Sequence, residues 1–94
     1  MGRSLSPFTR LTLLMSELKG LPIEDLIDVK KCDLAHHVEH LPEELESDEQ
    51  KAIAVQISEQ GTALLASIHS GNLAGAEGER KTLIATCRKL KDLL

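Results

Sequence analysis

The chain has 94 residues, of which 41% are hydrophobic and 28% are charged, and its formal net charge is −4. This length predicts one domain over residues 1–94, and the composition excludes both a disordered chain and a membrane protein. Phe8 is the single aromatic residue. Nucleic-acid-binding surfaces need stacking rings or a cationic face, so no nucleic-acid partner is expected.

The first predicted helix covers residues 7–18, after an expected disordered start at residues 1–5. Ser6 and Pro7 form a helix-entry signal, with serine as the N-cap and proline at the first helical position. Apolar residues follow at mostly helical spacing. Gly20 then stands where a left-handed C-cap belongs.

The segment 22–41 predicts either one continuous helix or two short ones. Pro22 opens it, and an apolar face follows that is interrupted at residues 30–31, which are both lysine. Asp33 is a candidate cap for a second piece. Pro42 ends the segment in either case, because the residue before a proline is disfavoured in helical conformation.

The C-terminal half predicts two long helices. Ser47 and Gln50 have the spacing of a capping box, with Ser47 as the N-cap of the first long helix. Gly61 lies inside this helix, either as a soft spot or as a place where another backbone comes close. Its predicted apolar positions are Ala52, Ile53, Ile57, Leu64, Leu65 and Ile68.

In the last helix, positions 76, 80, 83, 87, 90 and 94 follow an a/d heptad register, with Arg80 as the polar exception. Gly71 ends the first long helix, and Asn72 can cap the next one. Only these two residues separate the long helices, so the helices must run antiparallel. The chain is therefore predicted to be all-α, a bundle of three to four helices built on a long antiparallel C-terminal helical hairpin. An open hairpin that completes its core by dimerising is the alternative.

Charge is concentrated in the middle of the chain. Residues 21–60 carry three basic and eleven acidic side chains, a net −8. We interpret this as a solvated acidic surface. The alternative is a docking face for a basic partner, centred on Glu43, Glu44 and Glu46.

The segment from Cys32 to His40 contains three of the four histidines. In a helix, Cys32, His36 and His40 share one stripe, and Asp33, His37 and His40 share another. Side chains at i and i+4 can chelate one Zn²⁺, Ni²⁺ or Cu²⁺ ion, whereas an i to i+8 span of about 12 Å is too long. Cys32, His36, His37 and His40 are therefore candidate metal ligands, with surface histidines and a core cysteine as the alternative.

No stretch of the chain approaches the roughly 18 apolar residues that span a bilayer, and no signal peptide is recognised. We expect a cytoplasmic protein without membrane contact, whose cysteines are reduced. No catalytic motif brackets Cys87, and no glycine-rich phosphate loop is present, so an enzyme is not expected.

The predicted function is a protein–protein interaction module, such as a small regulator, adaptor or chaperone-like protein. An apolar helix stripe would bind a partner helix or a second copy, and a homodimer is expected. The alternative function is a transition-metal-binding or metal-sensing bundle that uses the cluster from Cys32 to His40, with zinc or a similar ion as its cofactor.

Overall fold

The computed structural model describes residues 6–28, 30, 34–41 and 45–94, apart from the side chain of Ala35. All regular secondary structure in this part of the chain is helical, and no strand is present there. The all-α fold class is therefore confirmed. Its elements in chain order are α1 (Pro7–Gly20), the 3-10 helix η1 (Ile23–Ile27), α2 (Leu34–His40), α3 (Asp48–His69) and α4 (Leu73–Asp92).

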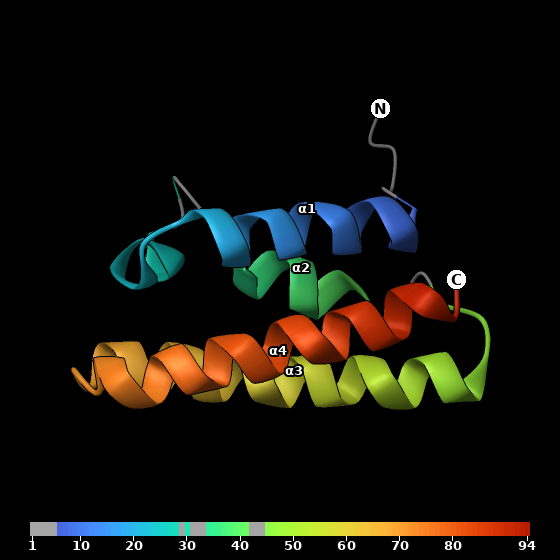
Figure 1. Cartoon of the computed structure of the whole chain (residues 1–94). Helices are drawn as coiled ribbons and strands as arrows, with labels where there is room; N and C mark the ends of the chain where they lie inside the picture. The colour runs from blue at the N-terminus through green and yellow to red at the C-terminus, as the bar shows by residue number, and fades with distance from the viewer. Residues whose placement is uncertain (1–5, 29, 31–33, 42–44) are drawn as a thin grey trace.

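The helices form two layers (Figure 1). α3 and α4 pack side by side as the predicted antiparallel hairpin, and α1, η1 and α2 lie on one side of it. α1 contacts α4, α2 contacts α3, and α1 and α2 contact each other. The core therefore lies between the layers, and no described helix covers the other side of the hairpin. We call that side the outer face of α3 and α4.

α1 begins as the sequence predicts. The hydroxyl of Ser6 accepts a hydrogen bond of 3.2 Å from the backbone N–H of Thr9, and proline occupies the start of the helix. The end differs from the prediction, because Gly20 is still helical and Gly71 is the described glycine with a positive φ. The predicted left-handed cap at Gly20 is therefore wrong, and the backbone N–H of Leu21 closes the helix on the carbonyl of Glu17.

Segment 22–41 is divided into two pieces, of which only the second is an α-helix. The side chain of Asp28 accepts a hydrogen bond of 3.0 Å from the backbone N–H of Lys30. This local bond offers the backbone an alternative to the helix and so separates η1 from α2. The predicted cap at Asp33 and the predicted stop at Pro42 lie outside the described residues.

The N-caps predicted at Ser47 and Asn72 are present, but the other half of the capping box is not, because the side chain of Gln50 is not hydrogen-bonded to the backbone N–H of Ser47. The hydroxyl of Ser47 accepts a hydrogen bond of 3.0 Å from the backbone N–H of Gln50. The side-chain amide of Gln50 donates to the carbonyl of Leu93 at 3.2 Å, which ties the start of α3 to the end of α4. Gly71 forms the turn with φ +83°, and Asn72 caps α4 by accepting from the N–H of Gly75 at 3.2 Å.

α3 packs on the first layer mostly through its predicted apolar positions. Ala52 is an exception, because it is exposed while Ala54 is fully buried. Gly61 marks the place where α2 approaches, since a Cβ atom there would lie 3.4 Å from Cγ1 of Val38. The close neighbour is thus a side chain and not a second backbone. The other buried positions of α3 are Ile53, Ile57, Leu64 and Ile68.

α4 follows the predicted heptad register over most of its length. Arg80, the polar exception, donates a hydrogen bond of 2.9 Å from Nη1 to the carbonyl of Leu21 and forms an ion pair with Glu77. Leu94 is 45% exposed, so the register ends before it and this part of the prediction is wrong. The buried register positions are Ala76, Leu83, Cys87 and Leu90. None of the described helices has the length and apolar character to cross a membrane.

Candidate functional site

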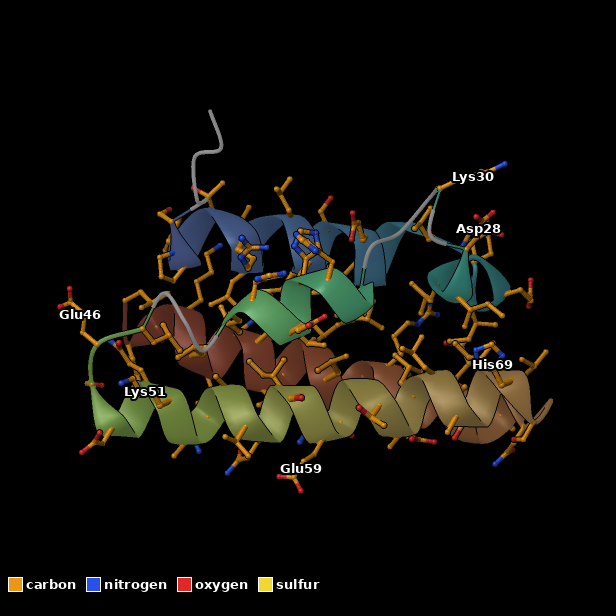
Figure 2. The ribbon with its side chains drawn as sticks, turned by 180° about the vertical axis from the view of Figure 1, so that it is seen from behind. Asp28, Lys30, Glu46, Lys51, Glu59 and His69 are labelled. Atoms are coloured by element: carbon orange, nitrogen blue, oxygen red, sulfur yellow. The ribbon has the colours of Figure 1, made fainter. Side chains whose placement is uncertain are left out.

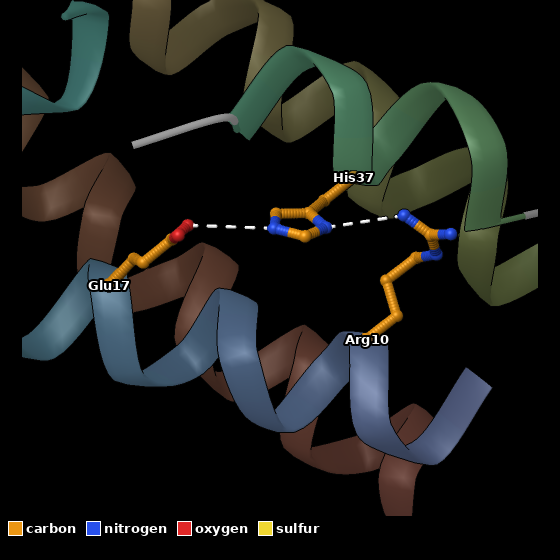
Figure 3. A network of polar contacts seen from close by, with 3 residues as sticks. All are labelled: Arg10, Glu17 and His37. Carbon is orange, nitrogen blue, oxygen red and sulfur yellow. Dashed lines mark hydrogen bonds and ion pairs between the residues drawn. The ribbon is translucent and has the colours of Figure 1, made fainter. Parts of the chain in front are cut away.

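His37, on α2, lies buried against α1 (Figure 3), with 8% of its surface exposed. Its Nδ1 atom is 3.3 Å from Nη1 of Arg10, and its Nε2 atom is 3.7 Å from Oε2 of Glu17. Arg10 and Glu17 are two helical turns apart on α1, so both face α2. These three side chains form a polar junction between the two helices of the first layer.

The contact with Arg10 fixes the tautomer of His37. A guanidinium can only donate hydrogen bonds, so Nδ1 of His37 accepts and the ring hydrogen lies on Nε2, toward the carboxylate of Glu17. A proton added at Nδ1 would place two donors face to face. The geometry is that of a histidine that joins α1 to α2.

His36 and His40 lie on a different side of α2 from His37. Their ring centroids are 4.3 Å apart, whereas those of His36 and His37 are 6.2 Å apart. The reason is helical geometry, because residues four apart are neighbours on a helix surface and adjacent residues diverge by about 100°. His36 is exposed and His40 is half-buried.

The structure thus brings together two of the four candidate metal ligands. His37 turns toward α1, and Cys32 lies outside the described residues. Within the described part of the chain, no group of three or more His, Cys, Asp or Glu side chains has a metal-binding arrangement. A metal site on the cluster from Cys32 to His40 stays a prediction.

The junction predicts that histidines of α2 differ in their effect on stability. His37→Ala should lower the free energy of unfolding by about 1–3 kcal/mol, because it removes a hydrogen-bond partner of a buried guanidinium. His36→Ala is the matched control on the exposed side of α2 and should stay within about 0.5 kcal/mol of the parent. Urea denaturation followed by circular dichroism compares the two. Equal, small losses would contradict the structural role of His37.

The outer face of α3 and α4 carries a groove of about 420 Å³. All of its lining residues belong to these two helices, so it lies on the side that α1, η1 and α2 leave uncovered. The lining residues are Gln60, Ala63, Gly75, Gly78, Glu79 and Thr82. Small side chains at the facing positions of both helices account for the hollow.

Two glycines in the groove have different physical explanations. A Cβ atom at Gly75 would lie 2.5 Å from Nδ2 of Asn72, so a larger residue there would have to displace the side chain that caps α4. Gly78 has no such reason. Apart from its chain neighbours and the backbone of its own helix, no described atom lies within 4 Å of the position that a Cβ atom would take there. Glycine inside a helix costs roughly 0.5–1 kcal/mol relative to alanine. Glycine at position 78 therefore lowers the stability of α4, and no described contact within the chain requires it.

Polar groups also line the groove. The amide oxygen of Gln60 is buried and has no hydrogen-bond partner among the described residues. The carboxylate of Glu79 accepts a hydrogen bond from the hydroxyl of Ser67, which links the two helices near the turn. An unsatisfied buried acceptor costs about 1–3 kcal/mol, so a donor supplied from outside would be stabilising at Gln60.

The exposed charges of the two long helices are opposite in sign. On α3 the exposed ionic side chains are Asp48, Glu49, Glu59 and Lys51, a net −2 with histidine neutral. On α4 they are Lys81, Arg88, Lys89 and Asp92, a net +2, and the half-exposed Glu77 is paired with Arg80. Glu59 points away from the first layer of helices (Figure 2).

The large exposed apolar side chains come from several elements of the structure. Leu13 is on α1, Ile27 is on η1 and Val55 is on α3. The ring of Phe8 is covered in part by Lys91, whose Nζ atom is 4.8 Å from the ring centroid. The others are Leu73 at the start of α4 and Leu93 and Leu94 after its end. Of the docking face predicted on Glu43, Glu44 and Glu46, only Glu46 lies within the described part of the chain, and it is exposed.

Comparison with protein-family models, with curated proteins and with solved structures finds no significant match for this chain. The candidate site therefore rests on the geometry of the chain itself. The groove was not anticipated from the sequence. The signal that could have located it is the spacing of small residues at Ala63 and Ala66 on one long helix and at Ala74, Gly78 and Thr82 on the other.

Proposed function

We propose that this chain is a protein–protein interaction module that acts by binding, not by catalysis, and that it binds through the outer face of α3 and α4. The observation that carries the proposal is the groove between these helices, with the open position Gly78 at its side. Small residues let another backbone approach closely, and exposed charges along both helices can orient it.

A helix is the partner element that suits this surface best. The groove runs between two antiparallel helices of 22 and 20 residues, and a third helix can lie along it with its side chains against Ala63, Gly78 and Thr82. This is the helix-in-groove mode, in which anchors spaced by three or four residues enter a groove. The predicted regulator, adaptor or chaperone-like roles all use binding of this kind.

Site-specific cross-linking tests the proposal. A photo-reactive diazirine amino acid replaces Thr82 in the groove, and the same amino acid replaces the exposed Ser16 of α1 as the control. Irradiation of cells that express each variant should give a defined protein adduct from position 82 and none from position 16. A product from Ser16 alone, or from neither position, would refute the proposed surface.

A transition-metal-binding bundle is the second candidate function. It is favoured by the pair of imidazole rings at His36 and His40, whose centroids lie 4.3 Å apart on adjacent turns of α2. Calorimetric titration of the chelator-treated protein with Zn²⁺ tests it. Stoichiometric binding that is lost in His36→Ala would support a metal site, and the absence of binding to the parent protein would exclude one for zinc.

A further inference from the structure

We propose that the occupant of the outer face is a second copy of this chain, related by a two-fold axis parallel to the helices, so that α3 of one copy lies against α4 of the other. This inference rests on the proposed function and names its partner. It is carried by the charges of the face, by the size of the face and by the open glycine at its centre.

The charges make the face complementary to itself. The exposed ionic side chains of α3 sum to −2 and those of α4 sum to +2. A two-fold axis along the helices places the acidic α3 of each copy opposite the basic α4 of its partner, twice in the same interface. An axis across the helices would instead place α3 on α3 and α4 on α4, which opposes like charges. Charge therefore selects the first arrangement.

The geometry of the helices also fits. α3 and α4 are antiparallel within one copy, so an axis parallel to both leaves each helix antiparallel to the helix that it meets across the interface. The four helices then form an antiparallel bundle of the ordinary kind. Adjacent helices in this arrangement are therefore antiparallel and have opposed dipoles, and only the diagonal pairs are parallel.

The face is large enough for a stable dimer. Two helices of 22 and 20 residues, side by side, cover about 30 Å by about 20 Å, a projected area of roughly 600 Å². The accessible area exceeds the projected area because side chains make the surface rough. Stable dimers bury roughly 800 Å² per partner, which is within reach of this face.

The open glycine gives an independent reason for a close partner. Gly78 is exposed and lies several residues from either end of α4. No described contact there would exclude a side chain. In the proposed dimer this position meets α3 of the second copy near Ala63, where two small residues allow the helices to approach. The buried amide oxygen of Gln60 belongs to the same groove, within the proposed interface.

The experiment is a charge-swap cycle measured by sedimentation equilibrium. One variant carries Glu49→Lys with Glu59→Lys and so reverses α3, and the other carries Lys81→Glu with Lys89→Glu and so reverses α4. All four side chains are exposed, so the fold should be kept, which circular dichroism checks. Each variant alone should dimerise roughly tenfold more weakly than the parent.

The mixture gives the decisive result. Combined in equal amounts, the two variants should form a heterodimer with the parental affinity, because α3 of each then faces α4 of opposite charge in the other. The chain with all four changes should again pair with itself. Gly78→Arg should abolish the dimer with the helix content intact, whereas Arg at the exposed Ser16 should leave it unchanged.

A parent chain that is monomeric at every concentration would overturn this inference, as would a dimer that all of these variants leave unchanged. The results also distinguish a failure of this inference from a failure of the proposed function. If the parent is monomeric while the cross-linker at Thr82 captures a different protein, the binding face stands and the second copy is excluded as its occupant. If the cross-linker captures nothing and the parent is monomeric, both proposals are refuted.

Discussion

Leu83→Ala is expected to lower the free energy of unfolding by about 2–5 kcal/mol. Leu83 is fully buried in the middle of α4, at a heptad position that faces the core between the two layers. Its truncation removes apolar contacts and leaves a cavity, because helices packed on both sides of it cannot close the space completely. Domains have a total stability of only about 5–15 kcal/mol, so the loss is a large part of the whole.

The measurement for Leu83→Ala is chemical denaturation with the slope as well as the midpoint recorded, since an unchanged slope shows that the cooperative unit is the same. Leu13→Ala is the matched control. Leu13 is 43% exposed on α1, and its truncation should cost within about 0.5 kcal/mol. Similar losses for the two variants would contradict the assignment of the core to the space between the layers.

A second large effect is expected from alkaline pH, through Cys87. This side chain is fully buried, and burial raises the pKa of its thiol from 9.0 to about 12 because the thiolate would be desolvated. The unfolded chain releases the thiol proton near pH 9.0, whereas the folded chain holds it until about pH 12. The stabilisation is therefore complete below pH 9.0 and is lost as the pH rises through that window.

The size of this effect follows from the shift. A difference of about three pKa units corresponds to roughly 4 kcal/mol of stability lost across the window, at a slope of up to about 1.4 kcal/mol per pH unit. The test compares the parent with Cys87→Ala, both in a Cys32→Ser background that removes the other thiol. Stability of the parent should fall more steeply with pH than that of the variant. Parallel curves would show that the thiol of Cys87 is not buried in the folded state.

Much of the fold could be predicted because its signals are local. The N-caps at Ser6, Ser47 and Asn72 are short-range hydrogen bonds between a side chain and the N–H groups that follow it, and all three are present. Gly71 and Asn72 leave room only for an antiparallel reversal. The division of segment 22–41 could not be decided, because it depends on the Asp28 turn competing with a helix that the apolar pattern also allows.

The candidate site was harder to predict because its residues act through distant partners. His37 resembles its neighbours in sequence, and only the packing of α2 on α1 separates it from His36 by bringing it to Arg10 and Glu17. The groove on the outer face is lined largely by small residues, whose spacing becomes informative only when α3 and α4 are placed side by side. Leu94 was misassigned because the heptad pattern of the sequence continues to this residue, whereas the burial of α4 in the core ends at Leu90.

The central claim is that the outer face of α3 and α4 is where this chain associates. The most direct measurement is a dilution series of amide NMR spectra of the labelled chain, which reports the association surface residue by residue. Concentration-dependent shifts should concentrate at the outer positions of both helices, near Glu59, Ala63, Gly78 and Thr82, and should spare α1. Shifts that map to α1 and α2 instead, with the outer face unchanged, would contradict the account.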